Sequence, residues 1–309
     1  MSQNTMLWVG FHVLVGILLV LDLFVFNRKA HEITVREALK WTAFWVGLAG
    51  LFCAGIFYWG TPVMALEFAT GYIIEESLSV DNLFVFLTIF SYFQVPSKYQ
   101  HKVLFWGIIG ALVLRASFIL GGIVLIQQFH FIIYLFGGFL LFTGIKLAIQ
   151  QEQKLEPEKN PVLKILRRSI GVSKYYYEDK FFIRKMGYTF ATPLFVVLVL
   201  IETTDLLFAV DSIPAVLAVS TNPFIIYTSN IFAILGLRTL YFALAGLVNI
   251  FHYLNLGMSV ILIFIGVKMM LSDIYKIPIT VALGVIVGIL VVSIAASLVL
   301  PKKEENVQE

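Results

Sequence analysis

The sequence contains little charge and almost no cysteine. Only 13% of its 309 residues are charged, against about a quarter in soluble domains, and 60% are hydrophobic. The single cysteine, Cys53, excludes an intramolecular disulfide. No apolar run carries cysteine and histidine at ligand spacing, which argues against a zinc or copper(I) site. The modest net charge of +3 does not indicate nucleic-acid binding.

Long apolar runs take the place of the missing charge. A helix needs roughly 20 apolar residues to cross a hydrocarbon core about 30 Å thick, so the runs predict an all-α polytopic membrane protein. The first run, Met6 to Phe26, lacks a basic leader and a small-residue cleavage site, and we interpret it as a retained span. The sequence predicts about nine spans: 6–26, 41–60, 64–93, 103–126, 130–149, 188–218, 224–248, 256–272 and 278–300.

The basic residues predict the orientation of the spans. They gather in the connections 27–40, 94–102 and 150–187 and in the tail, and Lys276 is the clear exception. Cytoplasmic segments are enriched in lysine and arginine, so nine spans with an external N-terminus and a cytoplasmic C-terminus fit this distribution. We expect 150–187, which includes three consecutive tyrosines, to form an amphipathic interfacial linker; a binding module is the alternative.

Polar residues inside the spans recur in the same order in two halves of the chain. An acidic motif is followed by one arginine in the next span and one lysine in the span after it. Three spans are an odd number, so the second copy enters the membrane from the opposite face, and transporters with such inverted repeats bind substrate at the repeat interface near mid-membrane. The recurring pairs are Glu75/Asp205, Asp81/Asp211, Asn82/Ser212, Arg115/Arg238 and Lys146/Lys268.

This repeat divides the chain into five predicted parts. Two N-terminal helices and a last helix with its tail flank the two three-helix repeats, and a cytoplasmic linker joins those repeats. The parts are 1–62, 63–149 for the first repeat, 150–187 for the linker, 188–272 for the second repeat, and 273–309.

Six acids are predicted to lie within spans. Each costs roughly 2.5–3.5 kcal/mol at the centre of a membrane helix, so they need a cavity, a partner or an ion. One interpretation is that they pair with the arginines and lysines as fasteners between helices. The other is a multi-carboxylate cation site, which the excess of acids over central bases favours. Lys146 and Lys268 lie near span ends, where snorkelling to the interface is expected. The acids are Glu75, Glu76, Asp81, Glu202, Asp205 and Asp211.

The available ligand atoms are all oxygens. The carboxylates are joined by the amide of Asn82, the hydroxyls of Ser79 and Ser212, and the carbonyl of Val210. Oxygen sites suit Mn²⁺, Ca²⁺ or Mg²⁺. We expect Arg115 and Arg238 to act as counterions or gates.

The spacing of the acids limits the geometry of such a site. Six residues on an unbroken helix separate two side chains by about 120° around the axis, so both acids of one half cannot reach one ion. Either one acid per half coordinates directly, or the helix is unwound. Pro214 favours unwinding in the second half, because it leaves the carbonyl of Val210 without its donor.

The acidic motifs resemble those of the TerC/Alx family of bacterial membrane proteins. The resemblance rests on Glu75 to Val85, on Asp205 to Pro214, and on Leu21-Asp22-Leu23 followed by a basic loop. It covers about residues 5–300 and implies a bacterial inner-membrane protein with inverted three-helix repeats. It also implies export of manganese(II) from the cytoplasm, with proton antiport, and Glu75, Asp81, Asp205 and Asp211 as the metal-site acids.

Two functions therefore stand as hypotheses. The first is Mn²⁺ efflux by alternating access, with Ca²⁺ and Mg²⁺ as further candidate ions. The second is a membrane partner protein that assists assembly or metallation of other proteins, with contacts made by 150–187. We expect no enzymatic activity and no cofactor, because the sequence contains no nucleophile–base pair and no cofactor motif. The expected partners are the lipid bilayer, a divalent cation and, under the second hypothesis, membrane proteins.

Overall fold

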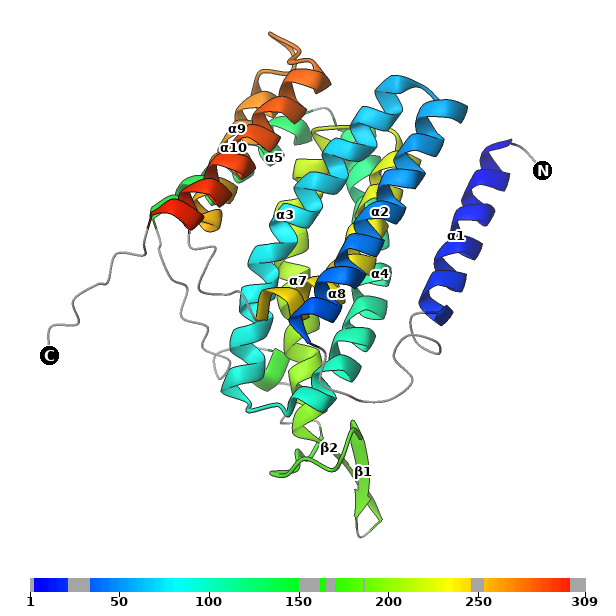
Figure 1. The fold of residues 1–309 in the computed structure, drawn as a ribbon, viewed down its shortest axis with the longest axis vertical. Helices are drawn as coiled ribbons and strands as arrows, with labels where there is room; N and C mark the ends of the chain where they lie inside the picture. Colours follow the sequence, from blue (N-terminus) through cyan, green and yellow to red (C-terminus); the bar gives the residue numbers. More distant parts are fainter. Residues whose placement is uncertain are drawn as a thin grey trace, which may run out of the picture.

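The computed structural model describes residues 3–21, 34–129, 131–149, 162–164, 170–185, 187–245 and 253–300, without the side chains of Gln3, Asn4 and Asp81. Within these ranges the chain forms nine helices longer than three turns and one short hairpin (Figure 1). The elements are α1 Gln3–Leu21, α2 Val35–Trp59, α3 Pro62–Tyr92, α4 Ser97–Gln128, α5 Ile132–Ile149, β1 Phe182–Lys185, β2 Tyr188–Ala191, α7 Pro193–Leu217, α8 Pro223–Ala245, α9 Leu254–Met270 and α10 Ile279–Val299.

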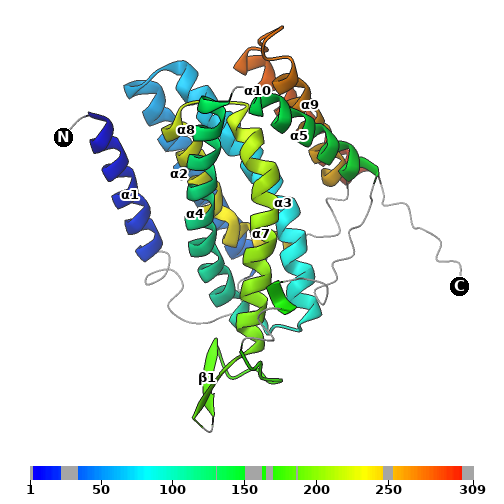
Figure 2. The same ribbon diagram turned by 180° about the vertical axis from the view of Figure 1, so that it is seen from behind.

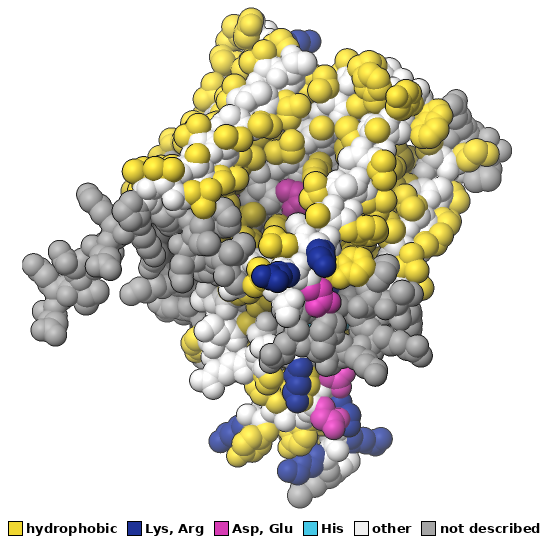
Figure 3. All heavy atoms as spheres, in the orientation of Figure 1, with side chains coloured by type: hydrophobic (Ala, Val, Ile, Leu, Met, Phe, Trp, Pro, Cys, Tyr) yellow, Lys and Arg dark blue, Asp and Glu magenta, His cyan; other side chains and the backbone are white. Residues whose placement is uncertain are grey.

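The all-α membrane class is confirmed. Six described helices, α2, α4, α5, α7, α8 and α10, are long and apolar enough to cross a membrane. The shorter α1 and α9 are also apolar, and α3 is longer than any of the six except α4 but carries four acids. Hydrophobic side chains cover the outer face of the helices, whereas charged ones gather near the hairpin (Figure 3).

Local signals explain most helix boundaries. Thr34 and Thr61 precede α2 and α3, and each side chain accepts a hydrogen bond from the backbone N–H three residues on, which caps the helix. Prolines 62, 193 and 223 occupy first helical positions, where their missing N–H is not needed. The cap at Thr34 starts α2 six residues before the predicted span at 41, because a charged first turn with Arg36 and Glu37 continues the helix outside the apolar run.

The predicted start of the sixth span falls on a strand instead of a helix. The span expected to begin at 188 begins at Pro193, since Tyr188–Ala191 instead pairs antiparallel with Phe182–Lys185. Gly187, at φ +81°, lies in the connection between the strands, and a residue before proline disfavours helix, which holds Thr192 extended. The hairpin lies in and just beyond the expected linker; residues 150–161, 165–169 and 186 fall outside the described part.

The helices form a main bundle with a tilted group beside it. Helices α2, α3, α4, α7 and α8 make the bundle, α5, α9 and α10 lie together at an angle to it, and α1 lies at its edge (Figures 1 and 2). Buried apolar side chains of α3, α4, α5, α7 and α9 form one core, and those of α3, α4, α7 and α8 form a second nearer the hairpin.

The packing pairs follow the predicted repeat. Helix α3 packs on α8 as α4 packs on α7, and α5 packs most extensively against α9. In Figure 1, α3 runs toward the hairpin end of the bundle and α7 runs away from it. Exchanging α3–α4–α5 with α7–α8–α9 leaves this set of partners unchanged, as an inverted duplication requires.

Glycines bring α5 and α9 close together. A Cβ added at Gly137 would lie 3.0 Å from the carbonyl oxygen of Gly266, and one added at Gly144 would lie 2.9 Å from that of Ser259. The same spacing of 122 residues relates Gly144 to Gly266 and Gly137 to Ser259. The contacts between the two helices therefore follow the spacing of the predicted repeat, and small residues permit the close approach that packs helices within lipid.

Candidate cation site

Arg115 lies in the middle of α4 with 1% of its surface exposed. Its Nη1 donates to the carboxylate of Glu75 on α3. Its Nη2 and Nε donate to Asp205 on α7, at 3.1 Å to Oδ1 and 3.4 Å to Oδ2. The planar guanidinium thus contacts both oxygens of Asp205 and still reaches a second acid, which the single ammonium of a lysine could not match.

Glu75 has a second donor, which lies on α8 in the other predicted repeat. Asn230 of α8 donates from Nδ2 to Oε1 of Glu75 at 2.6 Å, and Glu75 and Asp205 are 0% and 3% exposed. The Oδ1 atom of Asn230 is buried and has no hydrogen-bond partner among the described residues. Two carboxylates therefore gather around one cation, and the Asn230 amide group donates to one of them, with contributions from α3, α4, α7 and α8. We call Glu75, Asp205, Arg115 and Asn230 the central cluster.

Sequence reasoning missed Asn230. Its signal is an amide that follows Thr228 and Ser229 within a predicted span. It lies outside the repeated acidic motif, and the corresponding position in the first predicted repeat is Gly107. Only the packing of α8 against α3 brings it to Glu75.

The second acid of each motif does not join the central cluster within the described residues. Asp211 lies on α7 and accepts a hydrogen bond from Thr143 of α5 at 3.3 Å. Helix α7 continues unbroken through Pro214 to Leu217, so the unwinding expected there is absent. Proline removes one hydrogen bond near the C-terminal end and leaves the earlier turns intact, so Asp205 and Asp211 point to different neighbours. The side chain of Asp81 lies outside the described part.

The secondary ligand candidates are distributed over both motifs. Ser79, Asn82 and Ser212 are buried, and the hydroxyl oxygen of Ser212 has no partner among the described residues. Val210 is 41% exposed, and with α7 unbroken at this point its carbonyl lies within a continuous helix. Among the described residues no group of three or more His, Cys, Asp or Glu side chains could hold a metal.

The remaining acids face other helices. Glu76 accepts a hydrogen bond from Tyr72 at 2.8 Å and faces Gly236 of α8, where an added Cβ would lie 3.2 Å from its Oε1. Glu202 of α7 lies against Gly110 of α4, where an added Cβ would lie 2.2 Å from its Oε1.

The basic residues of the two repeats differ in their contacts. Arg238 of α8 lies 3.1 Å from Nε2 of His101, near the hairpin end of α4. Because a guanidinium only donates, that nitrogen is the acceptor. Lys268 donates to the carbonyl of Ala218 at 2.6 Å, at the C-terminal end of α7, and Lys146 is exposed. The exposure of Lys146 is consistent with the expected snorkelling. The Lys268 ammonium instead provides a hydrogen bond to a carbonyl at the C-terminal end of α7.

The fold and the central cluster define a class: a multi-pass integral membrane protein with a charged centre between two groups of helices. Residues 60–305 match the family model described as the integral membrane protein TerC family, and the chain belongs to that family. This confirms the resemblance of the acidic motifs.

The chain is also similar to curated proteins over nearly its whole length. It is 50% identical over 293 residues to "Uncharacterized membrane protein STKORF319" of Myxococcus xanthus, with 95% of this chain and 92% of that protein covered. It is 49% identical over 298 residues to "Putative membrane-bound redox modulator Alx" of Escherichia coli K12, with 93% and 92% covered. An uncharacterized membrane protein of Rickettsia bellii is 40% identical over 294 residues, with 95% and 97% covered. No solved structure gives a significant match.

Proposed function

We propose that this protein exports a divalent metal ion, foremost Mn²⁺, from the cytoplasm across the bacterial inner membrane. One observation carries the proposal: Arg115 lies buried between Glu75 and Asp205, one acid from each predicted repeat. These two buried carboxylates share one arginine side chain. If that side chain moves away, a metal ion can take its place between them.

Charge and ligand chemistry support this function. With both acids ionised, the central cluster has one more negative than positive charge, and buried carboxylates require a counterion. A divalent ion supplies two positive charges, and the oxygens of Glu75, Asp205 and Asn230 are the kind that Mn²⁺, Mg²⁺ and Ca²⁺ prefer. Arg115 would neutralise the acids when the metal leaves. Protons taken up by the carboxylates at that stage would give proton antiport.

The membrane arrangement supports alternating access. Rocking of α3–α4–α5 against α7–α8–α9 would expose the central cluster to each side in turn, because the cluster draws on both groups. The name of the Escherichia coli relative refers to redox modulation. This chain has a single cysteine, so a dithiol–disulfide couple within one molecule is excluded, and metal supply would be an indirect route to a redox effect.

The test is manganese retention in loaded cells. At equal expression, cells with wild-type protein should lose Mn²⁺ faster than cells with Glu75→Gln, Asp81→Asn, Asp205→Asn or Asp211→Asn. Glu178→Gln, which removes an exposed acid of the 170–192 segment, serves as the control and should match wild type. Equal efflux from wild type and all four variants would contradict the proposal.

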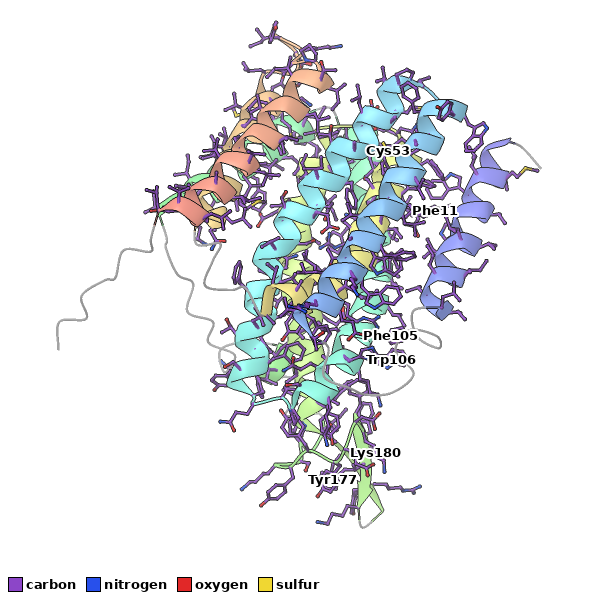
Figure 4. All side chains as sticks on the ribbon, viewed as in Figure 1. Phe11, Cys53, Phe105, Trp106, Tyr177 and Lys180 are labelled. Atoms are coloured by element: carbon purple, nitrogen blue, oxygen red, sulfur yellow. The ribbon has the colours of Figure 1, made fainter. Side chains whose placement is uncertain are left out.

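A second function is favoured by the hairpin. Tyr188 of β2 is 73% exposed, and Tyr175, in the segment before β1, is 72% exposed. Figure 4 places Tyr177 and Lys180 beyond Phe105 and Trp106 of α4, away from the helices. Such a surface suits a protein that contacts membrane or exported proteins and assists their assembly or metallation. Replacing β1 and β2 by a flexible linker discriminates: loss of function with unchanged metal binding favours this partner role.

A further inference from the structure

A small cavity lies next to the central cluster, between α4, α7 and α8. Its volume is about 10 Å³, and its polar lining consists of Glu202, Asp205 and Arg238. Leu104, Gly107 and Leu237 are among its apolar lining residues. This volume admits about one water molecule or one dehydrated ion. The cavity thus shares Asp205 with the central cluster.

Glu202 is an acid that lines this cavity. Among the described residues, no ion pair or hydrogen bond balances the charge of its carboxylate. Its Oε2 atom is buried and has no hydrogen-bond partner among the described residues. Its carboxylate instead lies against the backbone of α4: a Cβ added at Gly110 would overlap Oε1 at 2.2 Å, and one at Gly107 would lie 3.9 Å away. By contrast, Glu75 and Asp205 are both hydrogen-bonded to Arg115.

Glu202 lies between the hairpin end of the bundle and the central cluster. Helix α7 begins at Pro193 beside the hairpin, and at 1.5 Å per residue Glu202 lies about 14 Å along it and Asp205 about 18 Å. Residues three apart share a helix face, so the two carboxylates follow one another on the side of α7 that faces α4. Arg238, the cation of this compartment, is drawn toward His101 at the hairpin end.

We propose that Glu202 is the entry ligand of the transported cation: the first carboxylate that binds the ion arriving from the hairpin end, before the ion passes to Asp205. This inference rests on the proposed function and adds to it a residue and a route. Glu202 supplies a charge that Arg115 does not neutralise, and Gly107 and Gly110 leave α4 without side chains where the ion must pass.

The test uses Mn²⁺ uptake into everted inner-membrane vesicles, which present the cytoplasmic face to the medium. Glu202→Gln should raise the apparent KM for Mn²⁺ about tenfold, the effect of losing one charge-assisted contact, with kcat little changed. Glu202→Asp keeps the charge and should restore most of that loss. Equilibrium Mn²⁺ binding by the purified protein should stay within about twofold in both variants, because Glu75 and Asp205 are intact.

Two glycines of α4 provide an independent test variant and its control. Gly110→Ala places a methyl group on the carboxylate of Glu202 and should raise the KM as Glu202→Gln does. Gly121→Ala, at a position with nothing within 4 Å of the added atom, should behave as wild type. Wild-type uptake with an unchanged KM in Glu202→Gln overturns the entry role alone, and so does a shift that Glu202→Asp fails to reverse. Absence of uptake by wild type overturns the proposed function and this inference together.

Discussion

At the scale of single residues, Arg115 has the most demanding environment in the described part of the chain. Its guanidinium and its two acidic partners are almost fully buried, so their ionic interactions are barely screened by solvent. Removing one member of such a set leaves uncompensated charge in a medium of low dielectric constant, whereas the complete set is close to neutral in its effect on stability. The cluster is therefore sensitive to any change in its cations.

Replacing Arg115 by methionine tests this sensitivity. The buried Glu75 and Asp205 would lose their cation, and we expect a loss of about 3–5 kcal/mol in unfolding free energy. Millimolar Mn²⁺ should restore more stability to this variant than it adds to wild type, because the metal no longer competes with arginine. Thermal unfolding of the detergent-purified protein, with and without Mn²⁺, measures both effects.

The control for that experiment is Arg184→Met, which removes an exposed arginine from β1 and should leave unfolding unchanged. If Arg115→Met unfolds at the wild-type temperature and does not respond to Mn²⁺, neither the buried ion pairs nor the cation site is supported.

At the scale of elements, glycine determines how closely α5 and α9 approach. Gly266→Val should separate the two helices, because even a Cβ there would lie 2.8 Å from the carbonyl oxygen of Gly137. We expect a destabilisation of about 1–3 kcal/mol, the usual cost of overpacking. Gly138→Val, on α5, the other helix of this pair, with open space around the added atom, is the matched control. Equal unfolding temperatures for the two variants would contradict the packing argument.

The hairpin segment is held to the bundle by a contact that depends on pH. The Lys102 ammonium donates to Asp179 at 2.9 Å and lowers the pKa of that carboxyl below its ordinary 3.8. A lowered folded-state pKa gives stability above the unfolded-state pKa, and that stability is lost as pH falls through the folded value. The Lys102 and Asp179 side chains are 32% and 56% exposed, so solvent screens the pair and its contribution is below about 1 kcal/mol.

A spin label at Tyr177→Cys, in a Cys53→Ala background, should therefore be more restrained at pH 7 than at a pH well below 3.8. Lys102→Gln should be mobile at both pH values. A label that is equally restrained at pH 7 and pH 3 would show that Tyr176, whose hydroxyl donates to the carbonyl of Phe93, holds the segment by itself.

At the scale of the whole molecule, the two ends of the bundle should face different compartments. A cysteine placed at Tyr177 should be shielded from a membrane-impermeant thiol reagent added to intact cells, whereas one at Lys276 should react. Both substitutions are made without Cys53, and permeabilised cells give the full extent of labelling. The opposite pattern would reverse the predicted orientation, and with it the direction of transport.

Much of the architecture follows from the sequence because each membrane span must meet its physical requirements within its own segment of the chain. Every apolar run must satisfy its own backbone hydrogen bonds, so length and hydropathy alone predict helices such as α4, α8 and α10. The prediction is wrong where side-chain hydropathy and local backbone signals disagree. Tyr188–Ala191 is as apolar as a span end, yet Gly187 and Pro193 set it apart as a strand.

The sequence by itself determined the membrane class, the acids that lie within it, and the 120° divergence of Asp205 from Asp211, because these depend only on composition and helical periodicity. Tertiary structure decided which side chains these acids contact. Arg115 contacts Glu75 and Asp205, Thr143 contacts Asp211, and Asn230 contacts Glu75. The paired residues are 40 to 155 positions apart in the sequence. Such contacts depend on which helices pack together, and no local pattern in the chain encodes that choice.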